Sequence, residues 1–206
     1  VARGDSAQAH HRTNLQKAAD SAKVLPQSIS VGGVAAARAV LSEQQRANGV
    51  ALIEIGGATT NIAIYEEGDL QYAAVLPLGG INITNDLAIG LKTDPEIAEK
   101  LKIEHASAQL RGATSGVSLK YEGEIYSFQT SDIDEIVEAR LEEIFEAIQN
   151  ELKKARRAGK LPGGIVLTGG TAQLKGIVEY AKESLGLAAR LGKTSGYGGV
   201  ADNIEK

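Results

Sequence analysis

The chain has 206 residues, of which 43% are apolar and 23% charged, and a formal net charge of −4 at neutral pH. This composition is ordinary for a globular protein with a buried core, and an acidic chain without a stripe of Lys and Arg is not expected to bind nucleic acid. The absence of cysteine excludes disulfides and thiolate metal sites, and the three histidines show no ligand spacing with carboxylates.

Targeting signals are not evident in the sequence. No apolar stretch approaches the ~20 residues that a membrane span requires, and no signal peptide opens the chain, so we expect a soluble protein. The chain begins at Val1 and contains no methionine. We therefore expect Val1 not to be a native translation start, and the chain to be a piece of a longer protein.

The N-terminal part predicts helices followed by a run of strands. After a polar start, helices are expected over residues 14–24 and 34–46. The strands that follow are expected over 50–55, 60–65 and 70–77. Between the last two, Glu66-Glu67-Gly68-Asp69 is typical of a hairpin turn.

The remainder alternates between helices and strands. After Gly79-Gly80 we expect helices over 83–91 and 94–105, a hairpin of 116–120 with 124–128, and a long helix over 131–158 whose apolar residues repeat at a period of 3.6. Ser131 can cap this helix and Gly159 can end it. A strand at 164–168, a helix at 172–185 and a strand at 188–191 complete an α/β fold with an antiparallel portion.

The stretch from Leu52 to Tyr65 carries the first functional motif. An apolar strand ends near an acid, Glu54, and a turn of small residues leads into a strand that opens with hydroxyls. Small side chains let backbone N–H groups approach a phosphate, and the acid can hold a hydrated cation beside it. The alternative for this motif alone is an ordinary hairpin.

Two further motifs are weak when each is taken alone. Gly169-Gly170-Thr171 follows a buried strand and is expected to open a helix, whose N–H groups suit an anion or a ribose, although such turns often need glycine for geometry only. Glu99 and Lys102 are three residues apart on a helix and can meet one polar ligand, or simply form a solvated ion pair.

Taken in this order, the motifs resemble the second half of the actin-like ATPases, and specifically the FtsA family of bacterial cell-division proteins. The resemblance runs from about Asn14 to the end and includes Pro77 to Ala88, Ala98 to Lys102, Ile136 to Phe145 and Gly164 to Gly176. It implies an actin-like ATPase (ribonuclease H-like) C-terminal domain with an inserted smaller α/β subdomain. Residues 1–48 would end a preceding subdomain, 49–80 with 162–206 would bind ATP, and 81–161 would be the insertion.

The resemblance also implies a site for ATP and Mg²⁺. Glu54 would act on the metal ion through water. Glu99 and Lys102 would contact ribose and adenine. The second phosphate loop would comprise Gly56, Gly57, Ala58, Thr59 and Thr60, and the wall against adenosine and the α-phosphate would comprise Gly169, Gly170 and Thr171.

Departures from the family pattern predict weak or absent ATP hydrolysis. Glu54 is longer than the family's aspartate, and Asn61 replaces an acid that could orient water. Ala58 stands where a glycine is usual, so a positive φ would cost roughly 1 kcal/mol. Thr171 adds a branched side chain. Glu54 and Asn61 are the only catalytic candidates, so enzymatic activity is left open.

The family's partners are implied in the same way. Its members assemble into actin-like filaments, act with other division proteins at the cytoplasmic face of the membrane, and bind the C-terminal tail of the tubulin-like FtsZ through the inserted subdomain. Arg140 matches an arginine implicated in that contact, with a surface ion pair as the alternative. The membrane helix and the first phosphate loop are expected outside this chain. Alternatives are a pilus-assembly relative, or a sugar kinase or chaperone-type ATPase.

Overall fold

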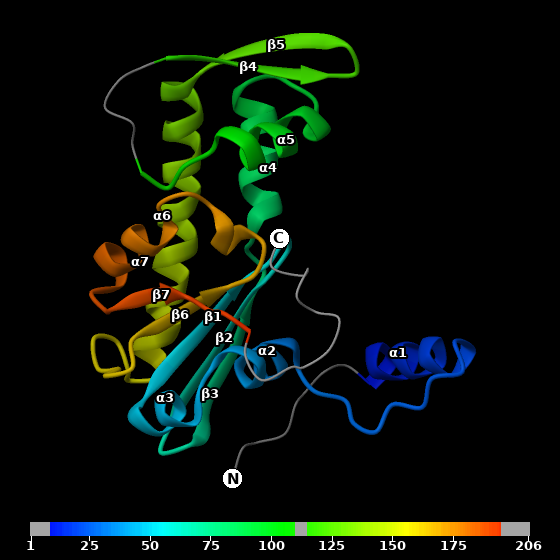
Figure 1. Cartoon of the computed structure of the whole chain (residues 1–206), viewed down its shortest axis with the longest axis vertical. Coiled ribbons are helices and arrows are strands. Elements are labelled where there is room, and N and C mark those ends of the chain that lie inside the picture. Colours follow the sequence, from blue (N-terminus) through cyan, green and yellow to red (C-terminus); the bar gives the residue numbers. More distant parts are fainter. Residues whose placement is uncertain (1–8, 110–114, 195–206) are drawn as a thin grey trace.

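The computed structural model describes residues 9–109 and 115–194. Its centre is a five-stranded sheet in the order β3-β2-β1-β6-β7 (Figure 1). The strands are β1 (Val50–Ile55), β2 (Thr60–Glu66), β3 (Asp69–Leu76), β6 (Ile165–Thr168) and β7 (Ala189–Leu191). The first three pair in antiparallel fashion, whereas β6 pairs with β1, and β7 with β6, in parallel. The predicted mixture of parallel and antiparallel strands is confirmed.

Helices cover both faces of this sheet, which explains why β1 is apolar along nearly its whole length. On one face, Ala37 and Val40 of α2 (Gly32–Val40) pack on Leu52 and other strand residues. On the other face lie α6 (Thr130–Lys154) and α7 (Ile177–Leu185). Because β1 is the central strand and helices cover both faces, its side chains are buried on both sides of the sheet.

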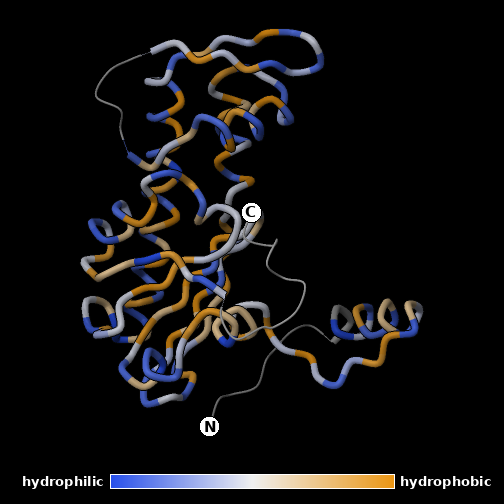
Figure 2. The backbone as a smooth tube through the Cα atoms, viewed as in Figure 1, coloured by the Kyte–Doolittle hydropathy of each residue, from blue (hydrophilic) through white to orange (hydrophobic). Residues whose placement is uncertain are grey.

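A smaller second part stands above the sheet in Figure 1. It contains α4 (Gly80–Gly90), α5 (Pro95–His105) and the hairpin of β4 (Gly116–Tyr121) with β5 (Glu124–Gln129). The upper turns of α6 pack against α4, and its lower turns reach the sheet. In Figure 2, hydrophobic and hydrophilic positions recur along the backbone of α6. The predicted stripe is buried, including Ile133, Val137, Leu141, Ile144, Ile148 and Leu152.

The N-terminal helices differ from prediction in their bounds. The first, α1 (Ala9–Ser21), lies apart from the body in Figure 1, and its described side chains are exposed except for the half-buried Ala19. The helix expected over 34–46 is two helices, because Ser42 and Gln45 form a capping box that starts α3 (Glu43–Asn48). Within the described ranges, no helix combines the length and apolarity needed to cross a membrane.

Two predicted features of helix ends are wrong. Ser131 does not cap α6, which begins one residue earlier, and its hydroxyl contacts Asp132 instead. Gly159 has a φ of +67° but does not end the helix, since α6 stops at Lys154 and Arg156 already has a φ of +58°. At the start of α6, Thr130 instead exchanges two hydrogen bonds with Ser115, each at 2.9 Å.

Candidate nucleotide-binding site

The turn after β1 is held from one side by the start of α4. The Gly56 N–H donates to Thr59 O at 2.9 Å and closes the turn. The Gly80 N–H donates to Gly56 O at 2.9 Å, and the Ile81 N–H donates to Gly57 O at 2.7 Å. The first turn of α4 therefore binds two successive carbonyls of the predicted phosphate loop.

These bonds fix where the loop's own N–H groups point. In a planar trans peptide the C=O and the following N–H point in opposite directions, and the described residues contain no cis peptide bond. With Gly56 O and Gly57 O directed at α4, the N–H groups of Gly57 and Ala58 are directed away from it. Two successive N–H groups on one side of a turn can bind an anion.

Gly79 allows this close approach. A Cβ at Gly79 would lie 2.7 Å from Gly56 O and 2.6 Å from Gly57 O, a distance that real Cβ atoms do not reach. Ala58 is not among the described residues with positive φ, so the backbone penalty expected there does not apply. Gly79 is therefore required because the start of α4 approaches the loop too closely for a Cβ. A left-handed backbone conformation is not the reason.

Glu99 and Lys102 meet in the structure, as their spacing predicts. Lys102 Nζ lies 2.6 Å from Glu99 Oε2, 2.9 Å from Thr84 Oγ1 and 3.1 Å from Gly80 O. Thr84 Oγ1 also lies within hydrogen-bond distance of Glu99 Oε2. Burial would raise the pKa of Glu99, but the hydrogen bonds from Lys102 and Thr84 and the charge of Lys102 lower it. Glu99 is therefore an ionised acceptor at neutral pH.

The turn after β6 does not open a helix as expected. Gly169 and Gly170 lead into a single 3₁₀ turn, η1 (Thr171–Gln173), in which the Ala172 and Gln173 N–H groups donate to Gly169 O and Gly170 O. The helix α7 starts only after Gly176, which has a φ of +80°. The predicted helix over 172–185 is therefore interrupted, and no α-helix N-terminus faces this site at 169–171.

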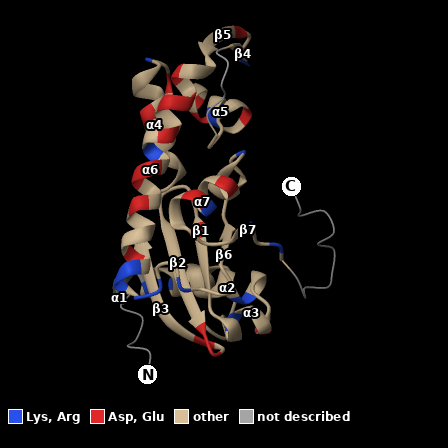
Figure 3. Ribbon diagram, turned by 90° about the vertical axis from the view of Figure 1, so that its left-hand side faces the viewer, with Lys and Arg blue, Asp and Glu red and all other residues tan. Residues whose placement is uncertain are grey.

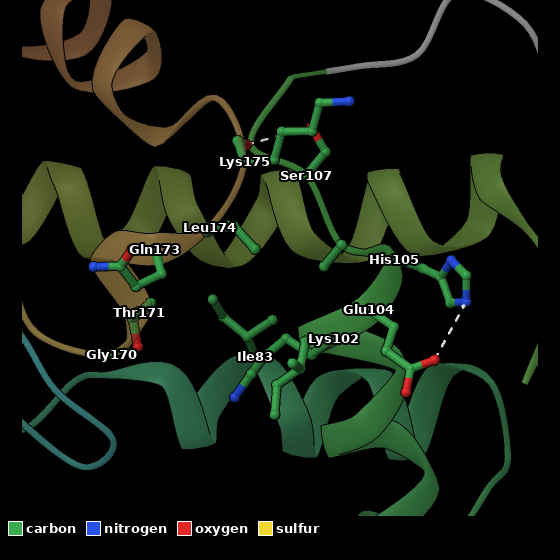
Figure 4. Close-up of a pocket in the computed structure, with 12 residues that line it drawn as sticks. Ile83, Lys102, Glu104, His105, Ser107, Gly170, Thr171, Gln173, Leu174 and Lys175 are labelled. Atoms are coloured by element: carbon green, nitrogen blue, oxygen red, sulfur yellow. Dashed lines mark hydrogen bonds and ion pairs between the residues drawn. The ribbon is translucent and has the colours of Figure 1, made fainter. Parts of the chain in front are cut away.

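The three motifs are joined around two cavities. One of about 590 Å³ is lined by Gly57, Glu99 and Lys102, with Ile81, Thr84, Asn85, Pro95 and Glu96. A second of about 310 Å³ also includes Lys102 and extends between α5 and η1, where Gly170, Thr171 and Gln173 contribute. Figure 4 shows Ile83 and Lys102 across this second cavity from Thr171 and Gln173.

Glu54 and Asn61 are paired with each other. They are direct partners across β1 and β2, and Asn61 Nδ2 donates to Glu54 Oε2 at 3.0 Å. Across the described ranges, no group of three or more His, Asp or Glu residues could hold a metal ion alone. Glu54 at the strand end suits contact with a hydrated ion whose other ligands are water and phosphate, as is usual for Mg²⁺.

Some predicted site residues lie away from the cavities. Thr60 is fully buried in β2, and its hydroxyl donates to Leu78 O at 2.8 Å. Its side chain therefore anchors the end of the loop and does not face the cavities. Arg140 lies in the smaller part, where it binds Asp86 at 2.5 and 3.0 Å and also binds Glu143. The structure thus brings together every predicted nucleotide motif, while Arg140 belongs to a separate surface.

Sequence reasoning assigned no site role to Gly80 and Thr84. Both take part in the contacts of Lys102, and the Gly80 N–H also donates to Gly56 O in the predicted phosphate loop. The available signal was a third glycine pair, Gly79-Gly80, at the start of a helix and a threonine one turn later. Its partners lie in distant segments, so the signal becomes specific only in the folded chain.

The five-stranded sheet with helices on both faces gives this chain the actin-like fold. It is similar to MreB5 of Spiroplasma citri bound to ADP, with a TM-score of 0.77, 18% identity, and coverage of 92% of this chain and 62% of that one. It is also similar to the PilM-PilN type IV pilus biogenesis complex, with a TM-score of 0.65, 18% identity, and coverage of 87% and 46%. At these identities the likeness shows the fold alone.

The chain belongs to the FtsA family of cell-division proteins. The family described as "Cell division protein FtsA" matches residues 51–204. Relatives with that description include those of Pseudomonas aeruginosa, 35% identical over 195 residues, and Bacillus subtilis, 37% identical over 193. The matches cover 93% and 92% of this chain but 47% and 43% of those proteins. The chain therefore spans about half the length of the curated relatives it matches.

Proposed function

We propose that the chain is the nucleotide-binding half of a cell-division scaffold that binds ATP with Mg²⁺. The observation that carries this proposal is the direction of the Gly57 and Ala58 N–H groups, which the bonds of Gly56 O and Gly57 O to α4 impose. These two N–H groups are suited to donate hydrogen bonds to the phosphates of the nucleotide. Residues 49–80 with 162–206 would form the ATP-binding subdomain, 81–161 the insertion, and 1–48 the end of a preceding subdomain.

The remaining contacts follow from the two cavities. Glu99 is an ionised acceptor suited to ribose hydroxyls, and Lys102 lines both cavities at the junction of ribose and base. Gly170 and Thr171 would bound the adenosine. ADP and AMPPNP occupy MreB5 of Spiroplasma citri, a protein of the same fold, which supports a nucleotide ligand here.

Hydrolysis is proposed to be weak or absent. A general base must be free to accept a proton from water. Here the Glu54 carboxylate accepts a hydrogen bond from Asn61, and Asn61 is neutral where the family has an acid. ATP would then stabilise an assembly-competent form of the protein more than it would supply a chemical step.

The cellular role is proposed from family membership. The protein would form actin-like filaments, act with other division proteins in the cytoplasm at the membrane face, and tether FtsZ through the FtsZ tail. MamK, which shares the fold with a TM-score of 0.66 at 17% identity, forms a double helical filament. This supports the proposal that a protein of this fold can assemble into filaments. The family match favours this role over the pilus-assembly and kinase alternatives.

The test is calorimetric titration of ATP with Mg²⁺, together with an assay of phosphate release. It is made on this chain and on a longer version that adds the N-terminal subdomain expected from the family. Lys102→Met should weaken ATP binding about tenfold or more, because a charged hydrogen-bond donor is lost. Lys100→Met is the matched control on the same helix, since Lys100 contacts Lys120 O and the Tyr121 ring instead.

Saturable binding with little phosphate release supports the proposal. Rapid release of phosphate would contradict the scaffold role, and failure of the longer version to bind ATP would contradict the nucleotide site itself. Equal losses in Lys102→Met and Lys100→Met would indicate a general effect on α5 rather than a contact with the nucleotide.

A further inference from the structure

Thr171 bonds directly to the opposite turn of the site. Its Oγ1 donates a hydrogen bond to Gly56 O at 2.9 Å, across 115 residues of sequence. Thr171 lies at the edge of the smaller cavity, as Figure 4 shows, and its side chain is only partly exposed. One hydroxyl therefore links the turn after β6 to the turn after β1.

The bonded carbonyl belongs to the peptide that presents the Gly57 N–H. Gly56 O accepts from both Thr171 Oγ1 and the Gly80 N–H, each at 2.9 Å. Two donors from different segments restrict rotation of this peptide more than one does. Because the peptide is planar, the hydroxyl of Thr171 helps to set the direction of the Gly57 N–H on its far side.

The surrounding space leaves little freedom for the Thr171 side chain. A Cβ at Gly80 would lie 2.4 Å from Thr171 Oγ1, 3.4 Å from Lys102 Nζ and 3.6 Å from Gly56 O. The start of α4, the phosphate loop and η1 thus converge on the hydroxyl. Glycine at position 80 is required for the hydroxyl to reach its acceptor.

We propose that Thr171 is a positioning residue, whose hydroxyl holds the Gly56–Gly57 peptide with its N–H aimed at a nucleotide phosphate. The inference rests on the proposed nucleotide site. It adds that Thr171, on the adenosine side of that site, also orients the peptide that faces the phosphates. Its consequence is coupling: disturbing η1 changes the recognition of phosphate, although η1 itself need not touch the phosphates.

The first test compares ATP with adenosine as ligands. Thr171→Val keeps the shape of the side chain but removes the hydroxyl, and Thr171→Ser keeps the hydroxyl. In the longer version described above, Val should weaken ATP binding roughly three- to tenfold more than it weakens adenosine binding, while Ser should retain both. A purely structural role would weaken both ligands alike. An unchanged ATP-to-adenosine ratio in Thr171→Val overturns the inference.

The second test needs no nucleotide, so it separates this inference from the proposed function. In Thr171→Val, amide hydrogen exchange at Gly80 should accelerate, because its acceptor peptide has lost its second anchor. In addition, Gly80→Ala should cost less stability in a Thr171→Ala background than in the original chain, because the 2.4 Å clash is relieved. Unchanged exchange, or strictly additive losses, would show that Thr171 does not position the loop, whether or not ATP binds.

Discussion

Gly169 and Gly170 are neighbours in one turn but meet different constraints. Gly169 has a φ of +94°, and a Cβ there would lie 2.4 Å from Ile55 O. Gly170 has a φ of −60°, and a Cβ there would meet nothing within 4 Å. The first glycine is therefore required by the packing of β6 against the end of β1, whereas the second leaves open space beside the cavity.

Gly169→Ala should destabilise the protein by more than about 1 kcal/mol, because it combines a disfavoured φ with a backbone clash. Gly170→Ala is the matched control and should change the free energy of unfolding by less than about 0.5 kcal/mol. Urea denaturation monitored by circular dichroism measures both. Similar losses in the two variants would contradict the assignment of distinct roles.

The two catalytic candidates, Glu54 and Asn61, form one hydrogen-bonded pair. The longer side chain of Glu54 reaches Asn61, whose amide donates to it at 3.0 Å. An acid at position 61 would place two carboxylates side by side, which is unfavourable for both in their charged forms. Each residue alone looked like a loss of function in the sequence, whereas the structure shows them as one pair.

At the scale of elements, a small polar cluster connects α6 to the edge of the sheet. Tyr72 of β3 donates to Glu151 Oε2 at 2.5 Å, and Lys154 donates to Glu151 Oε1 at 2.6 Å. The bond to Glu151, then burial and the nearby charge, raise the pKa of Tyr72 to about 12. The bonds from Lys154 and Tyr72 lower the pKa of Glu151.

Tyr72→Phe should lower stability by about 1 kcal/mol at neutral pH, because a hydrogen bond to a charged group is lost. The folded pKa of Tyr72 lies above its ordinary value of 10.0, so its stabilisation is present below pH 10 and is lost between pH 10 and 12. The difference between original and variant should therefore shrink over that range. Thermal unfolding at several pH values measures it.

The same cluster predicts an acid effect of opposite sign. Because the pKa of Glu151 is lowered, its stabilisation is present above the ordinary value of 4.5 and is lost as pH falls through the lower folded value. In Glu151→Gln this part of the acid-induced loss should disappear. Tyr121→Phe, on the distant hairpin, is a control that should leave the loss of stability unchanged at both low and high pH. This account would be contradicted if Glu151→Gln lost as much stability at low pH as the original chain does.

The strands were the most predictable elements, and the helices after turns the least. β1 was predicted to the residue, and β2 and β3 within one residue, because apolar or alternating runs bounded by turn residues mark strands. The helix after Gly170 was predicted as continuous because its residues suit a helix. The structure breaks it at Gly176, which has a φ of +80° and where a Cβ would also lie 2.6 Å from the Gln109 side chain.

At the scale of the whole molecule, Arg140 joins two helices of the smaller part. Its guanidinium binds both carboxylate oxygens of Asp86 on α4, and Glu143 on α6. Figure 3 shows acidic residues, coloured red, at several positions along α6. A carboxylate of an FtsZ tail would have to displace Asp86 from Arg140, so the Arg140–Asp86 ion pair competes with the proposed contact.

If Arg140 contacts the tail, Arg140→Ala should weaken binding of an FtsZ tail peptide about tenfold or more, as expected for loss of a charged pair at an interface. Asp86→Asn should then strengthen binding, because it releases Arg140. Fluorescence anisotropy with a labelled peptide measures both. Arg157→Ala is the control, since Arg157 pairs with Glu66 away from the smaller part. If neither Arg140→Ala nor Asp86→Asn changes affinity and both lower stability, Arg140 serves only to join α4 to α6.

The sequence alone determined the α/β class, the sheet strands, the buried stripe of α6 and three glycine-rich turns, because these depend on local periodicity and backbone preference. The tertiary structure decided which atoms meet. The bonds of Gly56 O to Gly80 and Thr171 join residues 24 and 115 positions apart, and no local pattern encodes such partners. Folding brings the turns into contact, and their shared hydrogen bonds then set the direction of the N–H groups on which the proposed nucleotide site depends.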